Sequence, residues 1–207
     1  MRYERSARRI GGESRSVISA VALGAAVSFA LVAMTPPSAD ATGGAPGSGS
    51  AAGTPLPEFT QTAADGWINS APLKVSDLRG HVVLLHVWAF ECWNCYRSFP
   101  WLTALEDKYQ SRGLVSIGVH TPELPQESDA AKVVAKTEEF GLHHPVMIDN
   151  DSAYWRALDN HYWPAWYVVD AQGRIRKLVI GEAHAGDQRA QAVEAAIDAL
   201  LKEAPTS

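Results

Sequence analysis

The spacing of apolar residues changes several times between residue 81 and the end of the chain. The run HVVLLHVWAF at 81–90 is almost continuously apolar and rich in β-branched residues, which is typical of a strand buried on both faces. Beyond it, apolar residues recur at helical spacing as far as residue 110. In chain order, the pattern predicts a strand at 81–90, a helix at 92–110, a strand at 114–120, a helix at 127–140, a strand at 145–148, a helix at 152–158, strands at 165–170 and 174–181, and a helix at 187–201.

This alternation of strands and helices predicts an α/β fold with a central sheet flanked by helices. The turn Ala171-Gln172-Gly173 joins the last two strands as a hairpin, so the sheet should be mixed, with an antiparallel edge. Pro100 lies within the first predicted helix and should kink it.

The N-terminal region has a different composition. Arginines precede an uncharged apolar run, Val17 to Met34, and a small-residue A-x-A site follows at Ala39 to Ala41. We interpret 1–41 as an export signal or membrane anchor and favour a cleaved signal over a retained anchor. Residues 42–55 are rich in Gly, Pro, Ser and Ala and are expected to be a flexible linker, which leaves 56–207 as the folded domain. The expected location is the periplasm or the outer face of the cytoplasmic membrane.

Composition narrows the possible functions. The formal net charge is −5, so the chain offers no basic surface for nucleic acid. Two cysteines are too few for a disulfide-rich scaffold, so a hydrophobic core must stabilise the fold.

Those two cysteines, Cys92 and Cys95, stand where the buried strand passes into a helix. The N-terminus of a helix favours an anion, and the thiolate is the nucleophile in disulfide exchange. Cys95, one helical turn later, can reach the sulfur of Cys92. We therefore expect Cys92 to attack a partner's disulfide and Cys95 to resolve the mixed disulfide, with no metal and no organic cofactor.

Other interpretations of the pair remain open. A structural zinc site usually has four ligands, often two such Cys pairs or a Cys pair plus two His. This chain has no other Cys, and His143 and His144 are adjacent rather than helically spaced. A copper-binding module and an inert disulfide are further alternatives, although so short a loop removes little chain entropy.

The chain also resembles the thioredoxin superfamily, especially its exported TlpA-like branch and the C-terminal domain of DipZ-type membrane proteins. The motifs that carry the resemblance are VVLLHVWAFECWNCYRSFPWLTALEDKY, WINSAPLKVSDLRG, IGVHTPE, HPVMIDND and YWPAWYVVDAQGRIR. The resemblance implies a thioredoxin-like fold with an N-terminal extension and a central insertion, and thiol–disulfide oxidoreductase activity.

The resemblance also implies roles for residues near the pair. Pro164 corresponds to the family's cis-proline, and the backbone of Trp163 would bind an extended peptide. Together with Trp93, these residues are assigned to substrate binding.

Three further residues are candidates for proton transfer or tuning. His86 stands where thioredoxin has a buried acid. It can accept a proton near neutral pH, although a structural, hydrogen-bonded core histidine is the alternative. Glu91 is adjacent to Cys92, and its charge opposes thiolate formation there. Glu123 ends the second strand and could approach the dithiol.

We thus expect an exported oxidoreductase that exchanges with cysteines of extracytoplasmic proteins, more as a reductant than as an oxidant. By the resemblance, a membrane electron carrier of the DipZ/CcdA type would recharge it. The alternatives are a disulfide-forming oxidant or a thiol peroxidase on the same fold.

Overall fold

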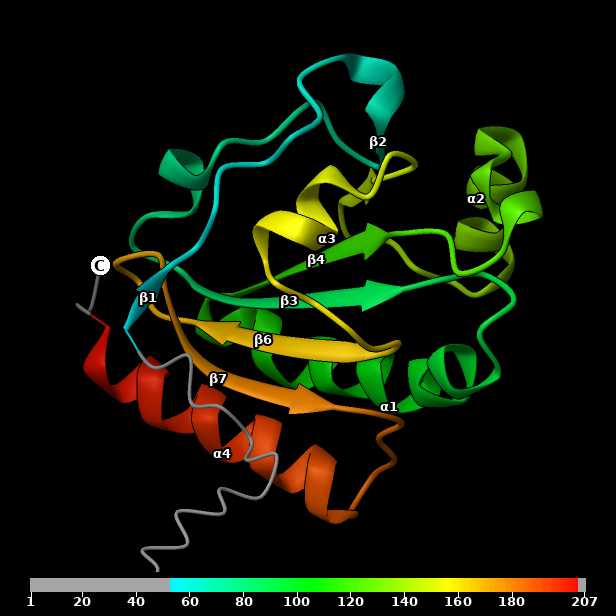
Figure 1. Ribbon diagram of the computed structural model, residues 1–207. Coiled ribbons are helices and arrows are strands. Elements are labelled where there is room, and N and C mark those ends of the chain that lie inside the picture. Colours follow the sequence, from blue (N-terminus) through cyan, green and yellow to red (C-terminus); the bar gives the residue numbers. More distant parts are fainter. Residues whose placement is uncertain (1–52, 205–207) are drawn as a thin grey trace, which may run out of the picture. The chain divides into compact units, whose positions relative to one another are not determined.

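A seven-stranded mixed sheet forms the centre of the domain in the computed structural model, which describes residues 53–204 (Figure 1). Its strands lie in the order β1-β7-β6-β3-β4-β5-β2. Their bounds are β1 Thr54–Pro55, β2 Trp67–Ile68, β3 Val82–Trp88, β4 Leu114–His120, β5 Val146–Ile148, β6 Ala165–Val169 and β7 Arg174–Ile180.

Within residues 53–204, three α-helices connect strands and a fourth follows the last strand. They are α1 Trp93–Tyr109, α2 Ala130–Glu139, α3 Ala153–Ala157 and α4 Gln188–Glu203. Short 3-10 turns occupy Ala64–Gly66, Val75–Leu78, Gln110–Arg112 and Pro125–Ser128. The α/β fold predicted from the apolar spacing is confirmed.

The pairing of the strands explains where the site forms. β3 pairs in parallel with β4, and β4 with β5, whereas β6 runs antiparallel to β3 and β7 antiparallel to β6. The register places Val87 opposite Ala165, so the end of β3 and the start of β6 lie at the same edge of the sheet. The segments that follow β3 and precede β6 are therefore neighbours.

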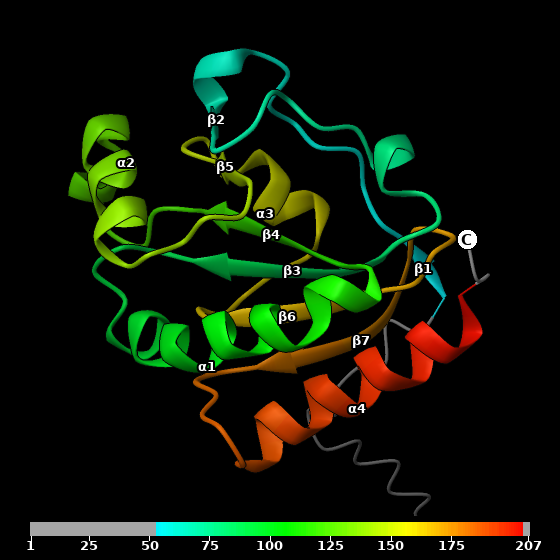
Figure 2. The ribbon, with the colours of Figure 1, turned by 180° about the vertical axis from the view of Figure 1, so that it is seen from behind.

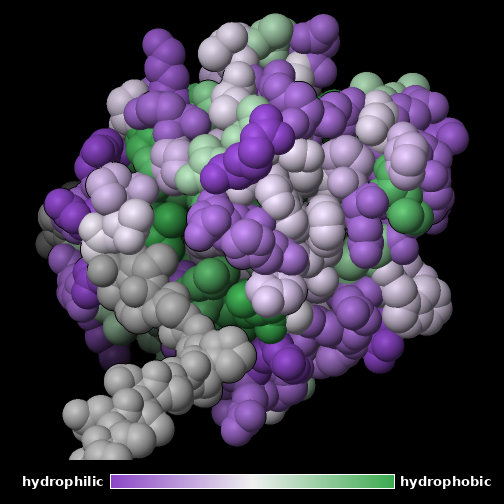
Figure 3. Space-filling model, viewed as in Figure 1, coloured by the Kyte–Doolittle hydropathy of each residue, from purple (hydrophilic) through white to green (hydrophobic). Residues whose placement is uncertain are grey.

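Each face of the sheet has its own apolar core. Leu84 and Trp88 face the layer that contains α1 and α4, whereas Val83, Leu85 and Val87 face the opposite layer. Figure 2 shows α1 and α4 together on one side of the sheet, and Figure 1 shows α3 on the other. On the face seen in Figure 3, hydrophilic residues predominate and hydrophobic ones form small separate groups. This fits a fold that buries most of its large apolar side chains against both faces of its sheet.

The second helix begins later than predicted. The sequence pattern indicated a helix over 127–140, but α2 starts at Ala130, after a separate 3-10 turn. Asp129 caps α2 by accepting hydrogen bonds from the backbone N–H groups of Ala131 and Lys132. A side chain that satisfies free N–H groups is a favourable helix start, so the boundary lies there.

Two edge strands were not predicted. β1 and β2 have two residues each, and so short a segment shows no alternation of apolar and polar positions. β1 pairs with β7, so the last two residues of the range expected to be a linker belong to the sheet. β1 and β2 precede β3, and α2 and β5 lie between β4 and α3.

The segment expected to be an export signal, 1–41, lies outside the described residues, as does the run Val17 to Met34. Within residues 53–204, no helix combines the length and the apolar character needed to cross a membrane.

Candidate active site

The two cysteines form a disulfide at the N-terminus of α1. Cys92 is the N-cap residue, and its sulfur accepts a hydrogen bond from the backbone N–H of Cys95 at 3.2 Å. The same N–H and the macrodipole of a 17-residue helix stabilise a thiolate at Cys92 once the pair is reduced. The strand-to-helix position predicted from the sequence is confirmed.

The two sulfurs differ in access. Cys92 retains 6% of its surface exposed, whereas Cys95 is completely buried. An incoming thiolate or disulfide can therefore reach only the Cys92 side of the pair. The asymmetry suits an attacking residue followed by a buried resolving residue.

The expected cis peptide lies at the same end of the sheet as this pair. The bond between Trp163 and Pro164 is cis, and Pro164 directly precedes Ala165, which pairs with Val87 near the end of β3. Trp163 is held in place on two sides: its ring stacks on Trp155 with centroids 4.0 Å apart, and its Nε1 donates to the carbonyl of Thr121 at 2.9 Å.

The backbone of Trp163 is available to a ligand. Within residues 53–204, neither its N–H nor its carbonyl makes a hydrogen bond. An extended peptide lying across this segment could pair with both groups as a short added strand.

Trp93, between the cysteines, is 62% exposed. Its ring lies edge-on to Tyr96, with centroids 4.8 Å apart, and Tyr96 in turn stacks on Phe140. The chain thus holds a large apolar side chain in solvent between the two cysteines of the disulfide, where a bound partner would bury it.

The two candidate acids lie at the surface. The Glu91 side chain is exposed and accepts a hydrogen bond from Nε2 of Gln126 at 2.7 Å. Glu123 is also exposed, and within the described residues its carboxylate makes no hydrogen bond or ion pair. The structure brings neither carboxylate into contact with a cysteine, so their tuning roles stay predictions.

A third acid, which the sequence did not reveal, is buried next to the pair. The carboxylate of Glu127 accepts hydrogen bonds at 2.7 Å from the backbone N–H groups of Glu91, Glu123 and Leu124. It thereby ties the residue before Cys92 to the loop after β4. Its position three residues after Leu124, at a capping position, was the only available signal.

His86 is completely buried on the α1 face of β3. Burial, followed by the electrostatic effect of the neighbouring His144, lowers its pKa well below the usual value for histidine. Its ring stacks on Trp166, and its Nε2 lies 2.8 Å from Nε2 of His144. The partner that a buried polar residue requires is therefore His144, which the sequence alone did not identify.

Comparison with known proteins agrees with this geometry. The family model described as Redoxin matches residues 51–197. Protein DipZ of Mycobacterium bovis is 39% identical over 120 residues, which are 56% of this chain and 17% of that protein. The thiol-disulfide oxidoreductase YkuV of Bacillus subtilis is 31% identical over 127 residues, covering 61% of this chain and 84% of YkuV. This chain therefore spans only a small part of DipZ but most of YkuV.

Solved structures share the fold. A thioredoxin-like protein studied in its oxidised form has a TM-score of 0.62 and 28% identity, and the match covers 74% of this chain and 98% of that one.

Proposed function

Because this chain belongs to the redoxin family and is a thiol–disulfide oxidoreductase, we propose that it acts outside the cytoplasm as a reductant of exported proteins. The observation that carries the exchange chemistry is the disulfide at the N-terminus of α1, with Cys92 still 6% exposed and Cys95 fully buried.

The reaction begins from the dithiol form. The thiolate of Cys92 attacks one sulfur of a client disulfide, a mixed disulfide forms, and the other client sulfur leaves as a thiolate. Cys95 then loses its proton and attacks the sulfur of Cys92. The client's second thiolate leaves, and the Cys92–Cys95 disulfide forms. Two electrons pass from this protein to the client, and the two client thiolates take up protons.

Three residues present the client to Cys92. The free backbone groups of Trp163 pair with an extended client segment, and the buried Pro164 holds that backbone at the sheet end. The exposed ring of Trp93 covers apolar atoms on the client side of the pair.

The direction of electron flow and the recharging partner rest on the likeness to DipZ. A membrane electron carrier of the DipZ/CcdA type would return the Cys92–Cys95 pair to the dithiol form. The apolar run at 17–34 and the A-x-A site support export to the periplasm or to the outer face of the membrane.

The reduction potential of the pair tests the direction. The full chain is equilibrated with thiol buffers of graded potential, and tryptophan fluorescence reports the oxidised fraction, with a Cys92→Ser variant as the blank. Reductants of this kind lie near −270 mV and strong oxidants near −120 mV, both approximate. A value near the low end supports a reductant. A value near the high end would make the protein a disulfide-forming oxidant.

Two rival functions have their own readouts. Peroxide consumption far above that of a free thiol, dependent on Cys92, would favour a thiol peroxidase. Stoichiometric copper or zinc that survives dialysis and is lost in Cys92→Ser would favour a metal-binding module. Within residues 53–204, no three histidine, cysteine or acidic side chains are grouped as a metal site.

A further inference from the structure

A chain of three ionisable side chains leads from the sheet to the surface of the domain. Nε2 of His86 lies 2.8 Å from Nε2 of His144, and Nδ1 of His144 lies 2.7 Å from Oε1 of Glu106 on α1. The second contact has the distance of an ion pair, although its alignment is not that of a hydrogen bond. Since 21% of the Glu106 side chain is exposed, its carboxylate has room to turn into line.

These contacts determine where the protons sit. A carboxylate only accepts, so it favours the tautomer of His144 that carries its proton on Nδ1. Nε2 of His144 then has a lone pair and accepts the proton of Nε2 of His86. That leaves Nδ1 of His86 without a proton, and this buried atom has no hydrogen-bond partner within the described residues. His86 therefore presents a free base inside the core.

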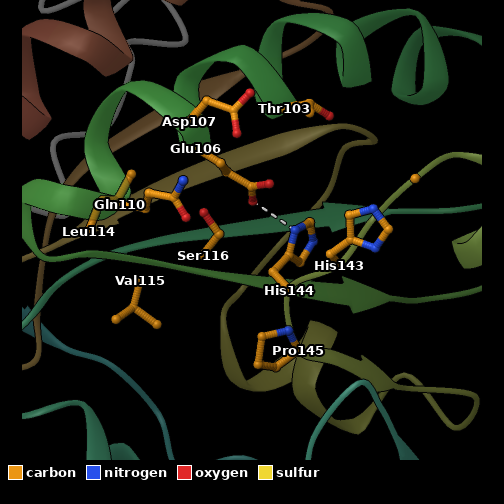
Figure 4. A pocket seen from close by; sticks show the side chains of 11 residues that line it. Thr103, Glu106, Asp107, Gln110, Leu114, Val115, Ser116, His143, His144 and Pro145 are labelled. Carbon is orange, nitrogen blue, oxygen red and sulfur yellow. Dashed lines mark ion pairs between the residues drawn. The ribbon is translucent and has the colours of Figure 1, made fainter.

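The outer end of the chain opens into a pocket. Its volume is about 400 Å³, and it is lined by Glu106, His144, Asp107 and residues of β4 and the loop before β5. Figure 4 shows the Glu106 carboxylate pointing toward His144, whereas that of Asp107, the next residue on α1, points away. A proton that reaches Glu106 is thus at the solvent.

The inner end lies beneath the start of α1. Phe99, one turn after Cys95, packs against the ring of His86 with centroids 6.1 Å apart. Cys95 is on the same buried face of the helix and in the same core layer. The resolving thiol and the free base are therefore both buried on the same side of the sheet, with Phe99 joining the helix of Cys95 to the ring of His86.

We propose that His86, His144 and Glu106 form a proton relay that carries the proton of Cys95 to the pocket; this rests on the proposed function. When Cys95 attacks the mixed disulfide, the proton leaves its sulfur and arrives at Nδ1 of His86. His86 releases its Nε2 proton to His144, and His144 releases its Nδ1 proton to Glu106 and the solvent. The electrons stay with sulfur: the Cys92–Cys95 bond forms, and the client leaves as a thiolate.

The surroundings of His86 favour passing the proton on to His144 over keeping it on His86. The low pKa of His86 means that it holds the extra proton only briefly. The ionisable groups around the relay are His120 at the end of β4, Cys95 and Glu106 on α1, His143 and His144 before β5, and Asp107 at the pocket. Among the acids of residues 53–204, only Glu106 contacts the histidine pair.

The test separates the two sulfur steps. The reduced full chain is mixed with one equivalent of dithio-bis-nitrobenzoate, which releases a coloured thiolate first when Cys92 attacks and again when Cys95 resolves. A positioned proton acceptor typically raises a reaction rate by roughly 10²–10⁴-fold. Because hydroxide from the solvent can also take up the proton of Cys95, we expect a smaller effect here: Glu106→Gln should slow the second phase about tenfold near neutral pH. The first phase should stay unchanged, and the deficit should shrink as the pH rises.

Asp107→Asn is the matched control, a neighbouring carboxylate on the same helix and pocket, and should change neither phase. A second variant, His144→Ala, enlarges the pocket: added imidazole should restore the second phase, and pyrazole, a ring of equal size but much weaker basicity, should not.

An unchanged second phase in Glu106→Gln, or equal slowing of both phases, would overturn the relay. Equal restoration of the second phase of His144→Ala by imidazole and by pyrazole would also contradict the relay. These outcomes leave the proposed function intact, because it is tested separately: it fails if the unaltered protein releases no second equivalent, has an oxidant's potential, or behaves as a peroxidase or metal-binding module.

Discussion

Glu127 accepts a hydrogen bond at 2.7 Å from the backbone N–H of Glu91, the residue immediately before Cys92. The other oxygen of the same buried carboxylate holds the backbone of Glu123 and Leu124. One side chain therefore joins the loop after β4 to the segment that positions the attacking sulfur. A carboxylate suits this place because it only accepts hydrogen bonds.

Glu127→Gln should destabilise the domain. The amide has one acceptor and one donor, so at least one backbone N–H would face another donor in a buried site. We expect a loss of about 2–3 kcal/mol in the free energy of unfolding, measured by urea denaturation. Glu123→Gln, at an exposed side chain, is the control and should cost less than about 0.5 kcal/mol. Equal effects of the two variants would show that the buried carboxylate has no special role.

Gly118→Ala should disturb the histidine pair. A Cβ on Gly118 would lie 3.1 Å from Nε2 of His86 and from Cγ2 of Val146, and 3.2 Å from Nε1 of Trp88. Since these neighbours are buried in a packed core, we expect a loss of about 1–3 kcal/mol, measured by thermal unfolding. The second phase of disulfide release should also slow. A variant with unchanged stability and both phases intact would mean that the His86 ring tolerates displacement.

His120 should make the fold sensitive to acid. It is buried against Trp88 and Phe90, and burial lowers its pKa to about 4. Between pH 4 and its usual pKa near 6.5, the unfolded chain binds more protons at this residue than the folded one. Stability therefore rises with pH across that window. At pH 7 the ring is mostly neutral in both the folded and the unfolded chain, so His120 causes little loss of stability there through proton binding.

Acidification from about pH 6.5 to 4 should cost roughly 3 kcal/mol at His120, with a further loss at His86 in the same direction. Urea denaturation at several pH values measures this slope. His120→Leu should flatten the slope, and His161→Asn, at an exposed histidine, should leave it unchanged. A slope that survives in His120→Leu would assign the acid sensitivity to other groups.

Trp93→Ala should affect clients more than small disulfides. Because the ring is exposed, its removal should change stability by less than about 1 kcal/mol. Loss of an interfacial tryptophan often costs more than 1 kcal/mol, so we expect the rate with a disulfide-bonded protein to fall roughly tenfold. The rate with dithio-bis-nitrobenzoate should change little.

Val134→Ala, another exposed apolar residue but on α2, should alter neither rate. If Trp93→Ala slowed the small disulfide as much as the protein, its ring would act on the chemistry of the cysteine pair rather than on client binding.

The amino-acid sequence by itself determined the features that depend on neighbouring residues. The buried strand 82–88, the helix that starts after Cys92 and the Cys-x-x-Cys spacing are local patterns of apolar spacing and capping. Their physical causes act within a few residues, so the pattern alone contains them. The cis peptide at Pro164, by contrast, was expected only from the resemblance.

Only the tertiary structure decided which polar side chains meet. The sequence indicated that His86 needs a partner, but His144 lies 58 residues away and was considered only as a metal ligand. Glu127 likewise reaches Glu91 across 36 residues. Such pairs depend on strand order, register and the packing of α1 against the sheet. Strand order, register and packing are determined by the burial of apolar residues throughout the domain, so they cannot be inferred from a short stretch of sequence.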